Sequence, residues 1–279
     1  MKSDDLILYI ITLIIKTLMQ YKTDYHIHTT YSDGRGRPED YIDPALMAGL
    51  SEIGFSEHLT PFMPPQKWSM DPANIGKYLE HIDRLKNNIK GIKIRTGLEV
   101  DFFPGREEET RAMLSSIPLD YIIGSVHYQG KETVDMGAEF YEGKDIDRLY
   151  EAYFETTIAA VRSDLFDIIA HCDLIRIYGF SPSFDPVHLY RKLAREMRIH
   201  NVAFELNTNG RNRPIADFYP DRNYLFIFSE EKVPVCVNSD AHSPERVAQH
   251  FDEAYSLLKN SGFGEMVVFE QRKKTVIPF

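Results

Sequence analysis

At 279 residues, the chain is slightly longer than a single α/β barrel, which usually takes about 200–250 residues. Its hydrophobic content of 43% is that of an ordinary globular protein with a sizeable core. The formal net charge of −10 argues against a nucleic-acid-binding surface, because phosphate backbones require clustered Lys and Arg.

The first recognisable element is an apolar N-terminal stretch, residues 6–19 (LILYIITLIIKTLM). Its 14 residues are too few to span a bilayer comfortably, and no small-residue cleavage site follows it. Three interpretations remain: a helix packed on the rest of the fold, a membrane-surface anchor, or a segment upstream of a native start at Met19. We treat residues 1–22 as an extension, and expect membrane contact only if the stretch is native and exposed.

From Thr23 onward, seven short apolar runs alternate with longer amphipathic stretches. The runs, which predict strands, are TDYHIHT, EIGFSEH, KIRTGLEVDF, YIIGSVH, DIIAHCD, AFELNT and VCVNSDAH. The amphipathic stretches predict helices around residues 39–49, 72–90, 105–116, 145–164, 185–200, 220–231 and 244–261. Three of these helices have an N-cap residue followed by proline: Asp71-Pro72, Asp185-Pro186 and Ser243-Pro244. Seven strand–helix alternations without a long linker predict a parallel sheet closed into one α/β barrel domain, residues 23–279.

Nearly every predicted strand begins apolar and ends in a titratable group. In a parallel barrel these C-terminal ends meet on one face, where such enzymes place their sites. Residues i and i+2 of a strand point to the same side, so His26 and His28 face one way together, as do Asp240 and His242. The other residues at these ends are His58, Glu99, Asp101, His127, His171 and Asp173.

This mixture of imidazoles and carboxylates favours the binding of Zn, Mn or Fe over that of Mg or Ca. With roughly nine candidate ligands and about four to six positions per ion, two or three divalent ions are expected, with a carboxylate bridging at least one pair. Such a cluster lowers the pKa of bound water and clamps the oxygens of an in-line displacement at phosphorus. The pattern therefore predicts hydrolysis of a small phosphate ester without a covalent intermediate.

The sequence HIHTTYSDG, followed by SEH, GLEVDF, GSVH, AHCD and NSDAH, resembles the polymerase and histidinol phosphatase (PHP) family. Within that family, the chain looks most like the monofunctional histidinol-phosphatases. The resemblance covers roughly residues 23–258 and implies a distorted seven-stranded (β/α)7, TIM-like barrel, in agreement with the seven runs counted above.

The resemblance also implies three sets of metal ligands. The first metal would be held by His26, His28, Glu99 and Asp240. Glu99 would bridge to a second metal, completed by His127 and His171. A third metal would be held by Asp33, His58 and His242.

The segments FDIIAHCDLIRIYG and ELNTNGRNRP resemble the phosphatase branch and contain Arg176, Arg211 and Arg213. A planar guanidinium suits a phosphate, so we expect Arg176 and Arg213, or else Arg211, to bind the substrate phosphate and stabilise its developing charge. Asp33, His242 or a metal-bound water would give a proton to the leaving alkoxide. The implied reaction converts L-histidinol phosphate and water to L-histidinol and phosphate, in histidine biosynthesis.

Two other functions stay open: another PHP phosphoesterase acting on a nucleotide, phosphodiester or phosphotyrosine, and a non-catalytic metal-binding module. Asp101 and Asp173 are candidates for orienting imidazoles, with loop capping as the alternative. Glu205 and Asn207 either bind a ligand or satisfy the barrel interior. Four further histidines are predicted on the surface: His81, His188, His200 and His250. Imidazole recognition needs a pocket carboxylate or a stacking aromatic, which the sequence does not single out.

The two cysteines, Cys172 and Cys236, are too few for a disulfide framework and do not form a metal-binding pair. Both fall in apolar runs, so we expect small buried side chains in a reducing, cytoplasmic compartment.

Overall fold

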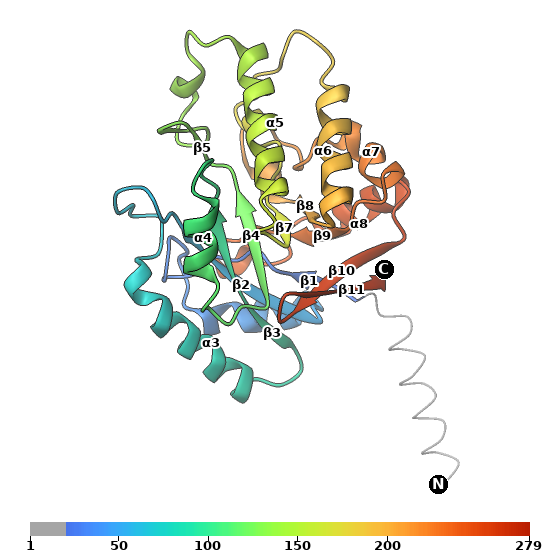
Figure 1. Ribbon diagram of the computed structural model, residues 1–279. Helices are drawn as coiled ribbons and strands as arrows, with labels where there is room; N and C mark the ends of the chain where they lie inside the picture. The colour runs from blue at the N-terminus through green and yellow to red at the C-terminus, as the bar shows by residue number, and fades with distance from the viewer. Residues whose placement is uncertain (1–20) are drawn as a thin grey trace, which may run out of the picture.

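The computed structural model of the protein describes residues 21–279, in which seven parallel strands form one sheet of order β1-β2-β3-β4-β7-β8-β9 (Figure 1). These strands are β1 (Thr23–Asp24), β2 (Glu52–Leu59), β3 (Lys93–Asp101), β4 (Tyr121–Ser125), β7 (Ile168–Ile169), β8 (Ala203–Asn207) and β9 (Val235–Asn238). The segments that directly follow the first and last strands are joined by bonds from His28 N–H to Ala241 O (2.9 Å) and from Ala241 N–H to His26 O (3.1 Å). The predicted α/β barrel class is confirmed.

Two small hairpins complete the strands: β5 (Tyr128–Gln129) with β6 (Glu132–Thr133), and β10 (Glu265–Glu270) with β11 (Lys273–Pro278). The α-helices are α2 (Ile42–Met47), α3 (Ile75–Asn88), α4 (Glu107–Leu114), α5 (Ile146–Arg162), α6 (Val187–His200), α7 (Leu225–Glu230) and α8 (Phe251–Asn260). Short 3-10 helices are η1 (Pro38–Tyr41), η2 (Pro72–Asn74), η3 (Ala138–Tyr141), η4 (Leu174–Arg176), η5 (Asn209–Asn212), η6 (Arg222–Tyr224) and η7 (Pro244–Arg246).

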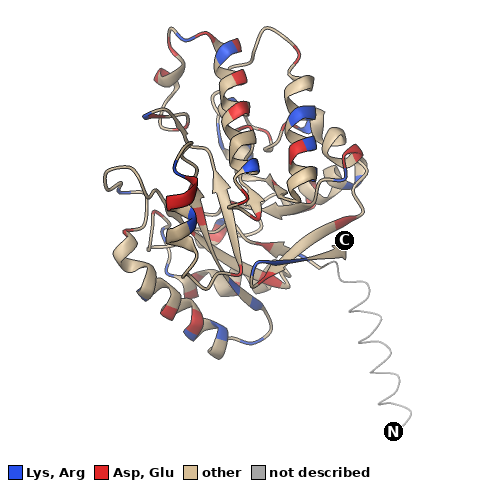
Figure 2. Ribbon diagram, viewed as in Figure 1, with Lys and Arg blue, Asp and Glu red and all other residues tan. Residues whose placement is uncertain are grey.

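The helices are amphipathic and cover the outside of the barrel. In α5 the buried residues recur at intervals of three or four positions, which places them on one face: Tyr150, Tyr153, Phe154, Thr157, Ile158, Ala160 and Val161. Helices α5 and α6 lie side by side (Figure 1), and Arg162 pairs with Glu196 across them at 2.7 Å. Figure 2 shows Lys and Arg interspersed with Asp and Glu on α3, α5 and α6. The apolar faces therefore build the core, while charges of both signs face solvent.

Tyr121 of β4 fills the interior of the barrel below the strand ends. Its hydroxyl donates to Tyr25 O at 2.6 Å and to Phe55 O at 3.1 Å. Gly97 on the neighbouring strand leaves room for this ring, because a Cβ there would lie 2.3 Å from a ring carbon of Tyr121. The lower interior is thus tightly packed, and polar side chains concentrate at the C-terminal ends of the strands.

The hairpin of β10 and β11 was not predicted from the sequence. Val267 and Phe269 pack in the interior cluster that includes Tyr121. The turn residues Gln271 and Arg272 both have positive φ (50° and 62°), and the Arg272 N–H donates to Asp120 O at 2.9 Å, just before β4 begins. The hairpin therefore covers the N-terminal end of the barrel.

The helix predicted over residues 244–261 was wrong at its start. The structure has only the 3-10 turn η7 after Ser243, whose side chain makes no cap bond, and α8 begins at Phe251. Ala248 and His250 between them have positive φ (54° and 58°), a conformation that interrupts a right-handed helix. By contrast, the predicted caps Asp71 and Asp185 each accept an N–H bond two residues on, from Ala73 (2.9 Å) and Val187 (3.0 Å).

Predictions for residues 1–20 lie outside the described residues. Tyr21 and Lys22, the last two residues of the predicted extension, contact β2 and the loop before it. The Tyr21 hydroxyl donates to Glu52 Oε1 at 2.5 Å, and Ser51 N–H donates to Lys22 O at 2.8 Å. Within the described part of the chain, no helix is both long and apolar enough to cross a bilayer. The division into an extension and one barrel domain stays a prediction.

Candidate metal centre

Side chains from the ends of six barrel strands converge at one mouth of the barrel. They fall into four groups whose ligand atoms lie within 4.8 Å of one another: His28, Asp33, His58 and His242; His26, Glu99 and His171; His26, His28 and Asp240; His58, Glu99 and His127. These are the nine residues predicted as metal ligands, and the described residues contain no other such group. His81, His188, His200 and His250 belong to none of these groups; His188 and His250 are exposed, as predicted, whereas His81 and His200 are partly buried.

Glu99 stands between two sets of imidazoles. Its Oε1 lies 3.2 Å from His171 Nε2 and 3.7 Å from His127 Nε2. Its Oε2 faces the other way, 3.2 Å from His26 Nε2 and 2.6 Å from His58 Nδ1. The parallel register of β2 and β3 places His58 directly beside Glu99. The two oxygens of one carboxylate thus serve different sets, the arrangement expected of a bridging ligand.

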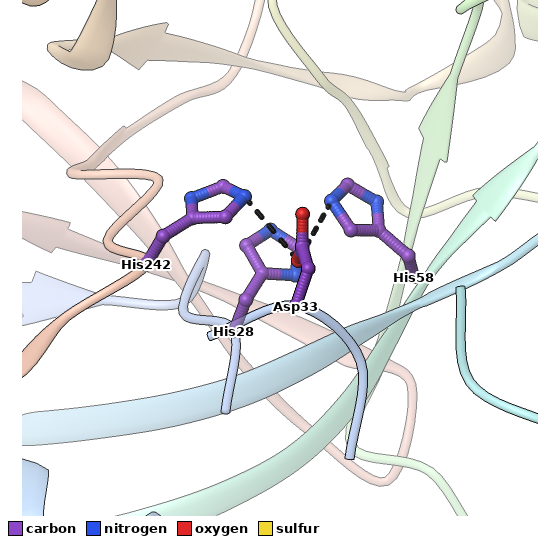
Figure 3. Close-up of side chains that lie close together, drawn as sticks. All are labelled: His28, Asp33, His58 and His242. Atoms are coloured by element: carbon purple, nitrogen blue, oxygen red, sulfur yellow. Dashed lines mark ion pairs between the residues drawn. The ribbon is translucent and has the colours of Figure 1, made fainter. Parts of the chain in front are cut away.

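Asp33 lies between two imidazoles on the outer side of the cluster (Figure 3). Its Oδ1 is 3.5 Å from His242 Nε2 and 3.7 Å from His58 Nε2. His28 stacks on His58 with ring centroids 3.9 Å apart. The loop reaches this position through a tight turn, because a Cβ on Gly34 would lie 2.0 Å from His28 O. The structure therefore brings together the predicted third ligand set and adds His28 to it.

Several buried polar atoms of the cluster have no hydrogen-bond partner. They are His26 Nε2, both ring nitrogens of His28, Glu99 Oε2 and His171 Nδ1. Glu99 Oε2 is orphaned even though His58 Nδ1 lies 2.6 Å away, since the contact lacks hydrogen-bonding orientation. A buried polar atom without a partner costs about 1–3 kcal/mol, so such atoms rarely occur together by accident. Of these atoms, His26 Nε2 and His28 Nε2 lie 3.2 and 3.5 Å from Glu99 Oε2, and lone pairs that converge in this way fit a divalent metal ion.

The charges of the cluster suit metal binding. Burial favours the neutral form of Glu99, but His58 and His26 outweigh it and hold the pKa of Glu99 well below its usual value. The same opposition between burial and His26 holds the pKa of Asp240 well below its usual value. Burial, followed by His58, lowers the pKa of His28 to about 3. Neighbouring carboxylates, Glu99 among them, outweigh burial and raise the pKa values of His26 and His58, so a metal ion bound here would replace protons on these two imidazoles.

Two buried carboxylates orient imidazoles of the cluster by contacting the Nδ1 side of the ring. His127 Nδ1 lies 2.9 Å from Asp101 Oδ1, and His26 Nδ1 lies 2.9 Å from Glu205 Oε2. When Nδ1–H donates to a carboxylate, Nε2 keeps its lone pair for a metal. Asp101 therefore has the predicted orienting position, and Glu205, whose role the sequence left open, has the same position behind His26.

Replacing Asp101 by asparagine is expected to weaken metal binding by about tenfold to a hundredfold, the usual cost of losing such a supporting carboxylate. The barrel should stay folded, because the substitution preserves side-chain size. Metal affinity is measured by titration against a competing chelator, with the exposed Asp43→Asn as a control. Equal affinities of the two variants would mean that His127 is positioned without Asp101.

Asp173 does not orient an imidazole, contrary to the interpretation considered above. Its Oδ2 instead accepts from Arg176 Nη1 at 3.0 Å and from the Tyr190 hydroxyl at 2.6 Å. Arg176 is only 7% exposed, and its Nη2 lies 3.1 Å from Asp221 and 3.4 Å from Asp217. The guanidinium is therefore surrounded by three carboxylates, a different environment from the predicted phosphate contact.

Two adjoining cavities open above the cluster. The first, of about 250 Å³, is lined by six of the nine predicted ligands together with Trp68, Asp135 and Arg213. The second, of about 370 Å³, shares Arg213 with the first and is also lined by Arg35 and Arg246. Trp68 and Asp135 were missed in the sequence because they sit in loops without a strand-end pattern, and Arg246 was missed because it lies in the 3-10 helix η7.

Of the three arginines predicted to bind phosphate, only Arg213 lines these cavities. Arg211 turns away, with its Nη1 donating to Ala216 O at 2.7 Å. Arg176 is held by its carboxylates, as described above. Of the three, Arg213 is therefore the arginine placed where a substrate phosphate could reach it.

The PHP domain model matches residues 24–209 of the chain. A probable histidinol-phosphatase of Deinococcus radiodurans is 34% identical over 257 residues, which cover 90% of this chain and 97% of that protein. The histidinol-phosphatase of Lactococcus lactis subsp. lactis is 28% identical over 263 residues, with 90% and 96% covered. A crystal structure of histidinol phosphate phosphatase from Lactococcus lactis, complexed with zinc, L-histidinol and phosphate, has a TM-score of 0.80 at 26% identity and covers 91% of this chain and 98% of that one. The chain therefore belongs to the PHP domain family, as its motifs predicted.

Proposed function

We propose that this protein is a metal-dependent phosphatase that hydrolyses L-histidinol phosphate to L-histidinol and inorganic phosphate. The observation that carries the proposal is the carboxylate of Glu99 set between two groups of imidazoles, below a cavity lined by Arg213. A multinuclear metal site beside a cation suits a phosphate ester. The substrate is supported by the names of the two relatives and by the ligands bound in the Lactococcus lactis structure.

The nine clustered residues would hold two or three divalent ions, for which we propose zinc, manganese or iron. The inner ligands are His26, His28, Glu99, His127, His171 and Asp240, and the outer ones are Asp33, His58 and His242. When bound, such ions activate a water molecule and neutralise charge on the phosphate oxygens. The carboxylates of Asp101 and Glu205 keep the inner imidazoles in place for this role.

The chain's own polar groups would divide the remaining work. The guanidinium of Arg213 binds the phosphate oxygens and stabilises charge that develops on them. His242 lines both cavities, and its Nε2 faces Asp33 Oδ1 at 3.5 Å, so an imidazole steadied by a carboxylate stands beside the substrate. Because His242 and Asp33 would serve as ligands of the outer ion, the proton that the leaving alcohol oxygen requires would come from a water molecule held at this centre.

Replacing Arg213 by alanine is expected to lower kcat/KM by about tenfold to a hundredfold, the value of one hydrogen-bonded charge contact. The loss should appear mainly in KM, and metal content should not change, because Arg213 is not in the ligand groups. Arg211→Ala is a matched control two residues away, since Arg211 faces Ala216 and lines neither cavity. If both variants behave alike, Arg213 does not bind the phosphate.

The function itself is tested by phosphate release from L-histidinol phosphate, before and after chelation, with Mn and Zn added back separately. The expected result is chelator-sensitive turnover with kcat/KM of about 10⁴ M⁻¹s⁻¹ or above. Hydrolysis of nucleotides, phosphodiesters or phosphotyrosine, but not of L-histidinol phosphate, would move the protein to another phosphoesterase activity. Loaded protein that hydrolyses no phosphate ester would instead be a non-catalytic metal-binding module.

We also propose that the reaction serves histidine biosynthesis in the cytoplasm. Cys172 and Cys236 are buried and unpaired, which fits a reducing compartment.

A further inference from the structure

The two adjoining cavities differ in charge from one end to the other. Arg35, Arg213 and Arg246 line the second cavity, and none of them has an ion-pair partner among residues 21–279. Asp33, Asp240 and Arg213 line both cavities, whereas Asp135 and Trp68 line only the first, and Arg35 and Arg246 only the second. The Asp135 carboxylate has neither a hydrogen-bond nor an ion-pair partner in the described part of the chain. The mouth above the metal centre therefore has an arginine end and a carboxylate end.

Asp135 is held at this place by its backbone. It follows the β5–β6 hairpin, which begins directly after the candidate ligand His127. The N–H of the fully buried Val134 donates to His127 O at 2.9 Å, and the Tyr178 hydroxyl donates to Asp135 O at 2.7 Å. Since the segment is anchored on both sides of its Cα, the carboxylate is presented at a fixed distance from the metal ligands.

Trp68 forms an aromatic wall of the cavity that Asp135 also lines. Its ring meets His58 edge-on with centroids 5.2 Å apart, lies 5.9 Å from His127, and stacks with Tyr128 at 6.4 Å. A cavity lined by both a carboxylate and an aromatic ring is a favourable environment for an organic cation, which can gain a charge contact and a cation–π contact.

We infer that Asp135 binds the ammonium group of the substrate and so selects phosphate esters of amino alcohols over esters without a cation. The inference rests on the proposed function and names its specificity-determining residue. With phosphate drawn to the arginine end, a neighbouring ammonium has Asp135 as its available anion. The reverse orientation would place phosphate against a carboxylate and the cation against arginines, so the two ends together allow one orientation. Asp135 and Trp68 are also the pocket carboxylate and the aromatic side chain that recognition of a cationic, ring-bearing substrate requires.

The test compares Asp135→Asn with the wild-type protein on two substrates. These are L-histidinol phosphate and 3-(imidazol-4-yl)propyl phosphate, which differ only in the amino group. We expect kcat/KM of the variant to fall by about tenfold to a hundredfold on L-histidinol phosphate and to stay unchanged on the analogue. The fall should appear in KM, with metal content equal to that of the wild type. Glu132→Gln is the matched control, because Glu132 is an exposed carboxylate of the same hairpin that pairs with Lys144 at 3.1 Å.

An equal loss on both substrates, no loss on either, or loss of metal from the variant would each overturn the inference. If the wild-type protein leaves L-histidinol phosphate intact, the proposed function fails. The same variants are then compared on O-phosphoethanolamine and ethyl phosphate. A loss confined to O-phosphoethanolamine would still support cation binding by Asp135, and equal rates on this pair would overturn it.

Discussion

Replacement of Glu99 by glutamine is expected to lower kcat by about a thousandfold or more, the scale seen when one member of a catalytic unit is removed. Glutamine has the size of Glu99 but no charge, and its amide nitrogen is not a metal ligand. Because Oε1 and Oε2 face different sets of imidazoles, one substitution weakens metal binding on both sides. Phosphate release and metal content of the purified variant are the two measurements.

The matched control is Glu109→Gln on the surface of α4, where Glu109 pairs with Arg106. It should keep full activity and full metal content, and circular dichroism should show both variants folded. A Glu99→Gln variant that retains all its metal and turns over at the wild-type rate would contradict the bridging role. Loss of metal from only one set of ligands would restrict Glu99 to that set.

Replacement of Arg176 by methionine is expected to reduce the free energy of unfolding by about 3–5 kcal/mol, the usual result of removing one partner from a buried ion pair. Methionine fills much of the arginine volume, so the loss reports the missing charge. Asp173, Asp217 and Asp221 would be left in a largely buried place without their shared cation. Denaturant unfolding of the variant and the wild-type protein measures the difference.

Arg191→Met is the matched control, because Arg191 makes a half-exposed pair with Glu230 at 3.4 Å on the surface of α6. Surface pairs of this kind contribute little, so its unfolding should resemble that of the wild type. The experiment also separates the two roles considered for Arg176. If Arg176 binds the phosphate, as its sequence context predicted, its replacement would raise KM and leave stability nearly unchanged.

The sequence predicted the barrel and the candidate metal centre because each polar residue interrupts an otherwise apolar strand at its end. His58 and Glu99, for example, close two successive runs, and the parallel register then places them side by side. Such strand-end signals depend only on local pattern and on the topology of a parallel barrel. All nine predicted ligands fall within the pattern or within the loop that follows the first strand.

The remaining features depend on contacts that local pattern does not encode. The turn of the C-terminal hairpin is formed by Gln271 and Arg272, which lack the Asn-Gly signature usual for a two-residue turn of positive φ. Arg176 sits shortly after a strand end, like a phosphate ligand, but Asp217 and Asp221 come from a loop more than forty residues away. Asp135 lies in a loop where nothing in the neighbouring residues indicates a binding role.

The hairpin of β10 and β11 closes one end of the barrel and so determines where substrate and products pass. Val267 and Phe269 fill one end together with Tyr121, so the metal centre opens to solvent through the cavities at the other end. Under the proposed function, the ester would enter, and the alcohol and the inorganic phosphate would leave, through these cavities. Product phosphate that remained bound at Arg213 would occupy the binding site of the next ester. Under the proposed function, that phosphate would have to leave before each new ester binds.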